Sequence, residues 1–510
     1  MNQTGKKLSA PLQALLLAAL CLLAYLPGLG RQEFVGTEDF RARIAWEMAQ
    51  SGEALVPTYY GRPILTKPPL HYWLLGRTLD WQGRRDPAAA RLLSVLALAA
   101  TVAMIAAAAN RAGGPQAGWL AGLGYLLAAN TWKNGANAEI DPLFAAFSVA
   151  MVLAWWRYLE GLHRNRAWPW ALAAGVAGGL AAMAKGPALL PFLVGLGAAT
   201  WWLRKKPQPG AVLALLLPLL ILGLAWPAAL QLADPDLEGA IAESAGKAVR
   251  WDGKAILKTL LYPLSLIGAS LPLSIAAFWR LKNPGRPLLD RYLMATITGA
   301  FAMLMLSAGK GTRYLLPCFP LLCLAAALRL ELLAASETFG RLIGWFCGLL
   351  ALAGAFWAGT ALPASGMVVL AALVLTGWVL SRRRQAFPLP ALILAAVLSR
   401  AFFTQVYVPA WEAGEDSLEE AVEALDDLLG EAREVAVARL ETPRLLDPLD
   451  RRIHYFDKPD DLHQALADGA RFPAILLRWK DPKDDPPEYR SIGLVRIYGK
   501  TFRVYLPPSP

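Results

Sequence analysis

Charged side chains gather in polar segments that separate long apolar runs. Glu38 and Asp39 follow the first apolar run, and Lys67 stands in "GRPILTKPPLHYW" before two prolines, which bias Lys67 away from helix. Asp141 and Lys185 lie in later polar segments, close to the ends of apolar runs. Cations beside a membrane suit a phosphate, and a carboxylate among them suits deprotonation of a hydroxyl or stabilisation of a cationic transition state. Together these residues indicate transfer from a lipid phosphate.

The apolar runs that must position these residues identify an integral membrane protein. Hydrophobic residues make up 56% of the chain, which contains 19 Trp, and the mean hydropathy is +0.38. Runs of about 17 to 22 residues can each cross the hydrocarbon of a bilayer as a helix. We expect about thirteen such spans, centred on Ala18, Leu98, Leu123, Val149, Val176, Val194, Leu219, Leu266, Thr298, Leu322, Leu350, Ala372 and Leu394.

The short loops predict the orientation, because cytoplasmic loops collect Lys and Arg. With the N-terminus in the cytoplasm, four basic segments face inward: 157–166, 204–206, 279–286 and 381–384. The segments 31–89, 131–141 and 232–258 then lie outside and carry the catalytic candidates. Everything after the last span is also outside, so we expect a multi-pass protein of the inner (plasma) membrane.

More cations lie on the outer side, where a membrane protein is expected to have few. Arg250 and Arg313 lie there, Tyr314 follows Arg313 directly, and Tyr72 follows Lys67 closely in the first outer segment. A single such residue is explained by an interfacial belt with lysines extended toward water. Their repetition favours a site in which Lys67 and Lys185, helped by Arg313 or Arg250, bind a phosphate.

The first outer segment also contains a helical pattern. In "DFRARIAWEMAQSG", Phe40, Ile44 and Met48 recur at every fourth residue and form one apolar face. This pattern predicts a short amphipathic helix lying on the membrane surface.

The chain divides near Pro409, where the apolar runs end. Residues 1–408 form the expected membrane domain, and residues 409–510 carry 21 Asp and Glu against 14 Lys and Arg, a net charge of −7. Helical and strand patterns in this tail predict a small extramembrane α/β domain, with helices at 417–429 and 459–466, strands at 434–440, 452–456 and 473–479, and a closing hairpin at 492–506. The fold class is therefore mainly α and polytopic, with a small C-terminal α/β domain.

Several motifs together resemble one family. The stretch "WEMAQSGEALVPTYYGRPILTKPPLHYW" after the acidic pair is similar to the bacterial 4-amino-4-deoxy-L-arabinose transferases and the dolichyl-phosphate-mannose protein mannosyltransferases, which are GT-C glycosyltransferases. Supporting matches are "AEIDPLFAAF", "AKGPALLP" and "GKGTRYLLPCFPLL". The resemblance covers roughly residues 10–405. It implies inverting transfer of a sugar from a polyprenyl phosphate to an envelope acceptor such as lipid A. It implies no required cofactor and leaves a divalent metal as an open alternative.

The resemblance also implies roles for single residues. The family's acidic pair is usually Asp-Glu, and here Thr37 takes the place of the Asp and Glu38 that of the Glu. Either Glu38 or the shifted Asp39 is then catalytic, or the acceptor is an already ionised phosphate that needs no base. Asp141 matches the second acid. Lys67 matches a donor-phosphate residue, and Lys185, Arg313 and Tyr314 match further donor-pocket positions.

Other functions remain as alternatives. A protein O-mannosyltransferase-like activity differs only in the acceptor, which is a lipid, a glycan or a protein. A lipid transporter or flippase should carry charges near span centres and paired broken helices, and neither is evident. No nucleic-acid motif is present, so the basic balance of the membrane part fits anionic membrane lipids.

Overall fold

The computed structural model describes most of the chain, and the fold is given for these residues: 9–162, 167–233, 253–269, 273–278, 287–307, 311–329, 400, 417–440, 442–497 and 500–507.

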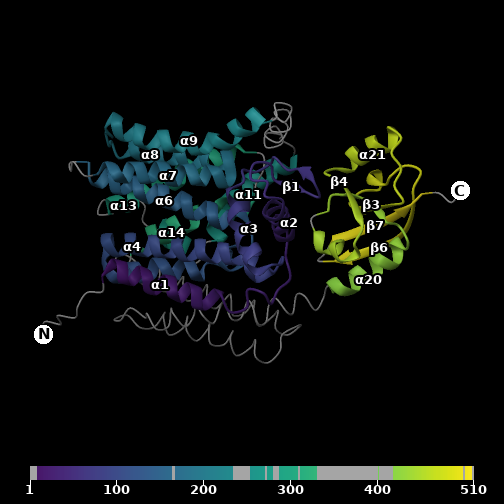
Figure 1. The fold of residues 1–510 in the computed structure, drawn as a ribbon. Helices are drawn as coiled ribbons and strands as arrows, with labels where there is room; N and C mark the ends of the chain where they lie inside the picture. The colour runs from purple at the N-terminus through teal and green to yellow at the C-terminus, as the bar shows by residue number, and fades with distance from the viewer. Residues whose placement is uncertain are drawn as a thin grey trace, which may run out of the picture.

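Apolar helices form a bundle with roughly aligned axes (Figure 1). A helix satisfies its backbone hydrogen bonds internally, which is what hydrocarbon surroundings demand. α1 packs on α4, α7 contacts both α6 and α9, and α8 packs on α13. The bounds are α1 (Ala10–Tyr25), α4 (Pro87–Leu127), α5 (Ala129–Asn134), α6 (Ile140–Glu160), α7 (Trp168–Lys185), α8 (Leu190–Trp202), α9 (Pro209–Ala233), α11 (Gly253–Ala269), α12 (Leu273–Phe278), α13 (Leu288–Leu306) and α14 (Cys318–Ala327).

Membrane-crossing length is found in several of these helices. Within the described residues, five stretches are long and apolar enough to span a bilayer: Pro87–Leu127, Ile140–Glu160, Trp168–Trp202, Pro209–Ala233 and Leu288–Leu306. Shorter apolar helices lie at the expected centres Ala18, Leu266 and Leu322. The expected spans centred on Leu350, Ala372 and Leu394 fall outside the described residues, so the total of thirteen stays a prediction.

Helix α4 contains two of the expected spans because the chain reverses within it. Gly114 has φ +80° and interrupts the helical backbone immediately before Pro115. A Cβ on Gly118 would lie 3.0 Å from the Cβ of Asn110, although eight residues of straight helix would separate them by about 12 Å. The passes centred on Leu98 and Leu123 are therefore the two arms of one helical hairpin.

The first polar segment folds into α2 (Glu38–Ser51), the short strands β1 (Thr58–Tyr59) and β2 (Arg62–Pro63), and α3 (Leu70–Gln82). The predicted amphipathic helix is present as α2, but its apolar face does not lie on a membrane surface. Ile44 and Met48 are buried in one hydrophobic cluster with residues of α3 and of the C-terminal domain. The predicted location on the membrane surface is therefore wrong. Packing against protein removes the same side chains from water.

The C-terminal domain is a five-stranded sheet with helices, as the sequence predicts. The strand order is β4-β3-β5-β7-β6, with β3 parallel to both β4 and β5, and β7 antiparallel to both β5 and β6. A capping box at Ser417 starts α20. The elements are α20 (Leu418–Leu429), β3 (Glu434–Ala438), β4 (Arg452–Phe456), α21 (Pro459–Ala467), β5 (Ala474–Arg478), β6 (Arg490–Ile497) and β7 (Lys500–Leu506).

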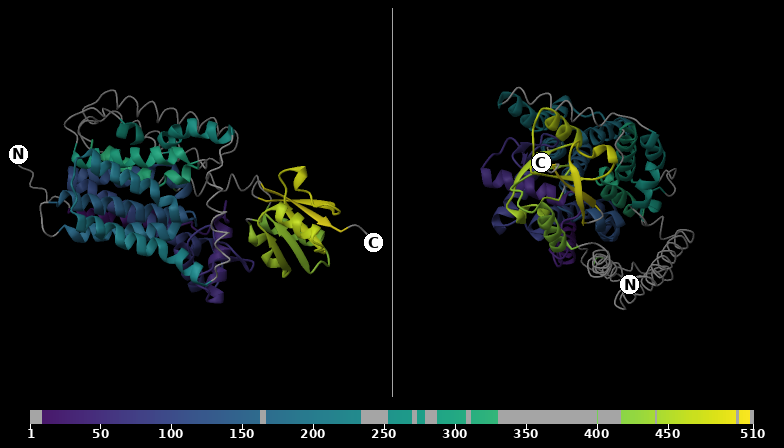
Figure 2. Two further views of the ribbon diagram at one scale, coloured as in Figure 1. Left: turned by 90° about the horizontal axis from the view of Figure 1, so that it is seen from above. Right: turned by 90° about the vertical axis from the view of Figure 1, so that its right-hand side faces the viewer.

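This domain lies over one end of the bundle. The segment from α2 to α3 lies between the bundle and the sheet (Figure 1), and the end-on view of Figure 2 shows the domain in front of the helices. We call this end of the bundle the domain end and the opposite end, where α6 finishes at Glu160, the far end. The first polar segment is thus enclosed between two folded bodies.

Candidate functional site

A buried ion pair lies at the domain end, where α6 begins and α7 ends. Lys185, the last residue of α7, donates a hydrogen bond to Asp141 in the first turn of α6. Each side chain is at most 6% exposed. A carboxylate near a helix N-terminus and an ammonium near a C-terminus are both favoured by the helix dipole. The ammonium of Lys185 also lies 4.7 Å from the centre of the Tyr314 ring.

A tight turn after Lys185 brings Lys67 to the same place. Gly186 has φ +62°, a conformation that L side chains rarely adopt, and it ends α7. A Cβ there would be 3.7 Å from the ring of Pro68, so the turn and the proline segment pack against each other. The two motifs that the sequence separates by more than a hundred residues are thus neighbours.

A second polar group lies beside this pair and includes a residue that the sequence did not single out. Arg41 on α2 donates to the Tyr72 hydroxyl over 2.5 Å, and its Nε lies 3.8 Å from the Glu139 carboxylate. The Thr37 hydroxyl donates to Glu139. Arg41 Nε is buried and makes no hydrogen bond to any described residue, so this donor remains available to an anion.

The short helix η4 (Thr312–Leu315) provides the remaining cation. Arg313 is exposed, and its guanidinium lies 5.7 Å from the centre of the Tyr314 ring. Because Tyr314 also contacts Lys185, the ring links the exposed and the buried cation.

The charges in this group act on one another. Burial lowers the pKa of Lys67 to about 8, helped by Arg41 and Lys185 and opposed by Asp141. Burial raises the pKa of Glu139 above its ordinary range, although Arg41 and the Thr37 hydroxyl oppose it. The four cations Arg41, Lys67, Lys185 and Arg313 exceed the two carboxylates Glu139 and Asp141. We call these six residues, with Tyr72 and Tyr314, the cationic site.

Glu38 lies outside the cationic site, although the sequence suggested it as a catalytic acid. Arg91 binds both of its oxygens through Nε and Nη2, at 2.9 and 2.7 Å. The backbone N–H groups of Val35 and Ala138 donate to the same two oxygens. A carboxylate offers about four lone-pair positions, and these four donors occupy all of them. Glu38 therefore holds loops and α4 together, and its oxygens are bound by the protein's own donors.

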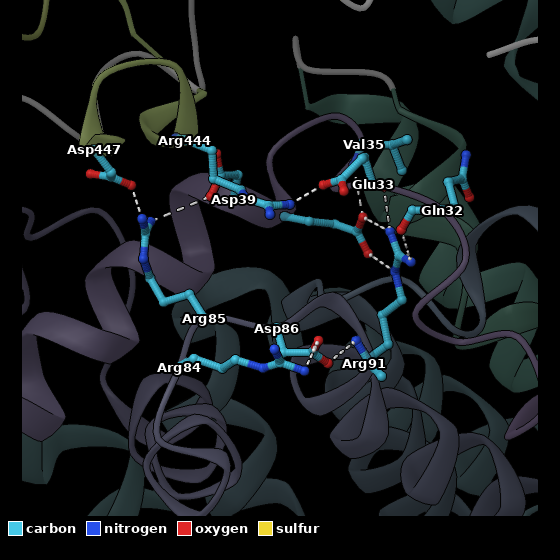
Figure 3. Close-up of polar contacts among 12 residues, drawn as sticks. Gln32, Glu33, Val35, Asp39, Arg84, Arg85, Asp86, Arg91, Arg444 and Asp447 are labelled. Atoms are coloured by element: carbon cyan, nitrogen blue, oxygen red, sulfur yellow. Dashed lines mark hydrogen bonds and ion pairs between the residues drawn. The ribbon is translucent and has the colours of Figure 1, made fainter. Parts of the chain in front are cut away.

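Asp39 points toward the C-terminal domain (Figure 3). It accepts a hydrogen bond of 2.9 Å from the backbone N–H of Arg444 and lies 3.5 Å from Nη1 of Arg85. Burial raises its pKa to about 6, although Arg85 and the Arg444 N–H oppose the shift. The sequence suggests Glu38, Asp39 and Asp141 together as the catalytic acids. The structure instead binds each of them to different donors.

Further ion pairs hold the C-terminal domain on the first polar segment. Asp447 binds Arg43 at 2.8 Å. Asp447 also pairs with Arg85, and Arg444 pairs with Glu33 (Figure 3). The buried Tyr59 hydroxyl donates to the Leu440 carbonyl over 3.0 Å. The C-terminal domain therefore packs against α2 and forms ion pairs with it, and Arg41 of the same helix belongs to the cationic site.

Replacing Asp447 by Asn should weaken the contact between the C-terminal domain and the first polar segment. The substitution leaves Arg43 and Arg85 without their shared counter-charge in a mostly buried place, which costs about 1–3 kcal/mol. We expect faster amide hydrogen exchange in β1 and in residues 443–449. Asp426→Asn is the control, because that carboxylate pairs with Arg451 inside the domain and is half exposed. Equal protection in D447N and the parent protein would contradict the assigned role.

Sequence reasoning did not single out two of the important arginines, and a third arginine that it did propose cannot be located in the structure. Arg250 lies outside the described residues. Arg41 and Arg91 were not singled out; Arg41 is one helical turn after Thr37 on α2, which is the signal that could have found it. Arg91 lies within an apolar helix, where a cation is costly unless it is paired. This cost is a signal that predicts a buried carboxylate partner for Arg91.

Known proteins share this chain's sequence and fold. Residues 14–223 match the family model described as dolichyl-phosphate-mannose-protein mannosyltransferase. An undecaprenyl phosphate-alpha-4-amino-4-deoxy-L-arabinose arabinosyl transferase of Pseudomonas savastanoi pv. phaseolicola is 28% identical over 419 residues, which cover 75% of each chain. A second transferase of that activity, from Pseudomonas fluorescens, is 27% identical over 403 residues, which cover 73% of this chain and 71% of the relative.

A solved structure extends the likeness to the whole fold. ArnT from Cupriavidus metallidurans, bound to undecaprenyl phosphate, has a TM-score of 0.71 and 17% identity, and the match covers 96% of this chain and 97% of that one. This likeness shows a common fold. The matched family model, the curated relatives and the common fold agree with the family that the motifs resemble, the aminoarabinose transferases and protein mannosyltransferases.

Proposed function

We propose that this protein is a membrane glycosyltransferase that moves a sugar from a polyprenyl-phosphate donor to an acceptor of the cell envelope. The observation that carries the proposal is the convergence of four cations on two carboxylates at the domain end. Such a site matches a phosphate that gains negative charge as the sugar leaves. The curated relatives are named as transferases that use an undecaprenyl-phosphate sugar.

The reaction follows from these charges. The acceptor oxygen attacks the anomeric carbon of the sugar, the bond from that carbon to the phosphate oxygen breaks, and the phosphate leaves with the electron pair. Lys67, Lys185 and Arg41 stabilise the departing phosphate, and Arg313 binds it from the exposed side. Attack from the face opposite the phosphate inverts the configuration. The proposed mechanism requires no cofactor, and a divalent metal stays an open alternative.

The carboxylates have separate tasks. Asp141 holds the Lys185 ammonium toward the phosphate. Glu139, whose raised pKa makes it a better base near neutral pH, takes the proton when the acceptor is a hydroxyl. When the acceptor is an ionised phosphate such as that of lipid A, no base is needed and Glu139 orients Arg41. The relatives' names support aminoarabinose as the sugar.

The same proposal includes a placement in the membrane. The described cations Arg157 and Arg204 lie at or next to the ends of α6 and α8 at the far end, opposite the C-terminal domain. By the bias of cytoplasmic loops toward Lys and Arg, the far end faces the cytoplasm. The cationic site and residues 409–510 then lie on the outer side of the inner membrane, with about thirteen spans connecting the two sides.

Reconstitution tests the function. Full-length protein in vesicles should convert polyprenyl-phosphate aminoarabinose and lipid A into free polyprenyl phosphate and lipid A heavier by one sugar, as measured by mass spectrometry. A deletion strain should lack the same sugar mass in its envelope. If the protein consumed the donor with another acceptor, only the assignment of the acceptor would need revision. Failure to bind polyprenyl phosphate would refute the proposal.

Donor binding should weaken above pH 8. Lys67 is charged below its pKa of about 8 and neutral above it, so its attraction for the phosphate disappears as the pH rises. We expect the affinity for polyprenyl phosphate to fall by up to about tenfold per pH unit between pH 8 and 9.5. Lys67→Arg should abolish this dependence, since arginine stays charged. A parent protein whose affinity is constant over this range would contradict the assignment.

A further inference from the structure

A cavity of about 440 Å³ opens at the far end of the bundle, between α4, α6 and α7. Its volume lies in the range of small-molecule sites. Ala103, Ala107 and Ala154 line it, and their small side chains leave the space empty. About 24 Å of helix α6 separates Arg157 at this cavity from Asp141 in the cationic site. The cavity is therefore separate from the site of transfer.

The mouth of this cavity is cationic. Arg111 and Arg157 line it, and Glu160 is the carboxylate among the described residues of the lining. Arg157 pairs with Glu160, but its Nε is buried and makes no hydrogen bond to the residues that the structure describes. Arg111 is exposed and makes no hydrogen bond or ion pair with the described part of the chain. Donors for an anion therefore remain on both arginines.

The interior of the cavity is apolar and runs along the helices. Ala103 and Arg111 lie eight residues apart on one arm of α4, which corresponds to about 12 Å of depth. Trp170 lines the cavity and lies 5.4 Å from the Arg157 guanidinium, and Trp is typical of the level of lipid headgroups. An occupant must then combine an anion at the mouth with a hydrocarbon chain inside.

We propose that this cavity binds an anionic phospholipid, whose phosphate contacts Arg111 and Arg157 and whose acyl chain enters between α4 and α6. Phospholipids surround the far end of any membrane-spanning bundle, and their charge complements the mouth. The donor's phosphate, by contrast, has its own four cations at the domain end. This lipid site does not depend on the identity of the transferred sugar.

Photo-crosslinking tests this site in the full-length protein. The probe is phosphatidylglycerol with a diazirine in its acyl chain, a minor component of phosphatidylcholine vesicles. Labels should concentrate on residues 103–112 and 150–157. Arg111→Ala should lower this labelling about fivefold, which corresponds to about 1 kcal/mol per basic residue near an anionic surface. Lys206→Ala, which removes an exposed cation outside the cavity, should leave it unchanged.

A second variant distinguishes binding of the acyl chain from binding of the lipid headgroup. Ala107→Leu fills part of the cavity and should reduce labelling by diazirine derivatives of phosphatidylglycerol and phosphatidylcholine alike. Equal labelling of R111A and the parent protein would overturn the proposal, as would labels spread evenly along α9. Stronger labelling of the same residues by a photoactivatable polyprenyl phosphate would overturn it in favour of the donor lipid.

Discussion

Lys185→Gln should lower kcat by about 10²–10³-fold, the usual cost of removing one preorganised group that stabilises developing negative charge. Lys185 is buried, is held by Asp141 and lies over the Tyr314 ring, so its ammonium is fixed before the donor arrives. Turnover is measured as release of polyprenyl phosphate from the sugar donor. Lys206→Gln, an exposed lysine at the far end, is the matched control and should keep parental turnover.

A second substitution separates catalysis from folding in this experiment. Lys185→Gln alone leaves Asp141 buried without its counter-charge, and breaking such a pair costs about 3–5 kcal/mol of stability. The double variant Lys185→Gln, Asp141→Asn removes both charges. It should regain much of the thermal stability while turnover stays low. If turnover recovered together with stability, Lys185 would be a structural residue and the phosphate assignment would fail.

Glu38→Gln should destabilise the protein by about 3–5 kcal/mol, because it leaves the Arg91 guanidinium buried without a counter-charge. The amide also turns one acceptor into a donor that faces existing donors. Unfolding temperature in detergent is the measurement. Glu160→Gln is the control, because its carboxylate is half exposed and such surface pairs contribute about 0–1 kcal/mol.

The fraction of E38Q that stays folded decides between a structural and a catalytic carboxylate. Since four donors already occupy Glu38, the folded fraction should turn over within about tenfold of the parent protein, below the range typical of a lost general base. Replacing Glu38 and Arg91 together by Met removes the unpaired charge, but it leaves the N–H groups of Val35 and Ala138 without their acceptor, so it should recover only part of the stability. A folded but inactive E38Q would restore the acid role that the sequence suggested.

The C-terminal domain connects these results to α2. Arg41 enters the cationic site from a helix whose apolar face and whose Arg43 bind the domain. This domain, whose net charge is −7, also contributes Asp447, which pairs with two arginines of the first polar segment. The domain thus contributes to positioning the site without adding a side chain to it.

Local patterns in the sequence determined much of this protein. Helical spans follow from apolar runs of membrane length, and the tail's strands follow from their alternation and β-branched content. Lys67, Asp141 and Lys185 could be chosen because an ionisable group beside hydrocarbon is costly and needs a reason. The structure brings these three together.

Only the tertiary structure decided which charges meet. Glu38 and Asp39 are adjacent in sequence, but successive helical residues point about 100° apart, so one binds Arg91 and the other faces Arg85. Arg41 joined the site because Gly76 lets α2 approach α3 until a Cβ would lie 2.9 Å from the Ala45 carbonyl oxygen. Pairing of charges depends on distances between side chains far apart in the chain, and the local periodicity that reveals a helix does not contain those distances.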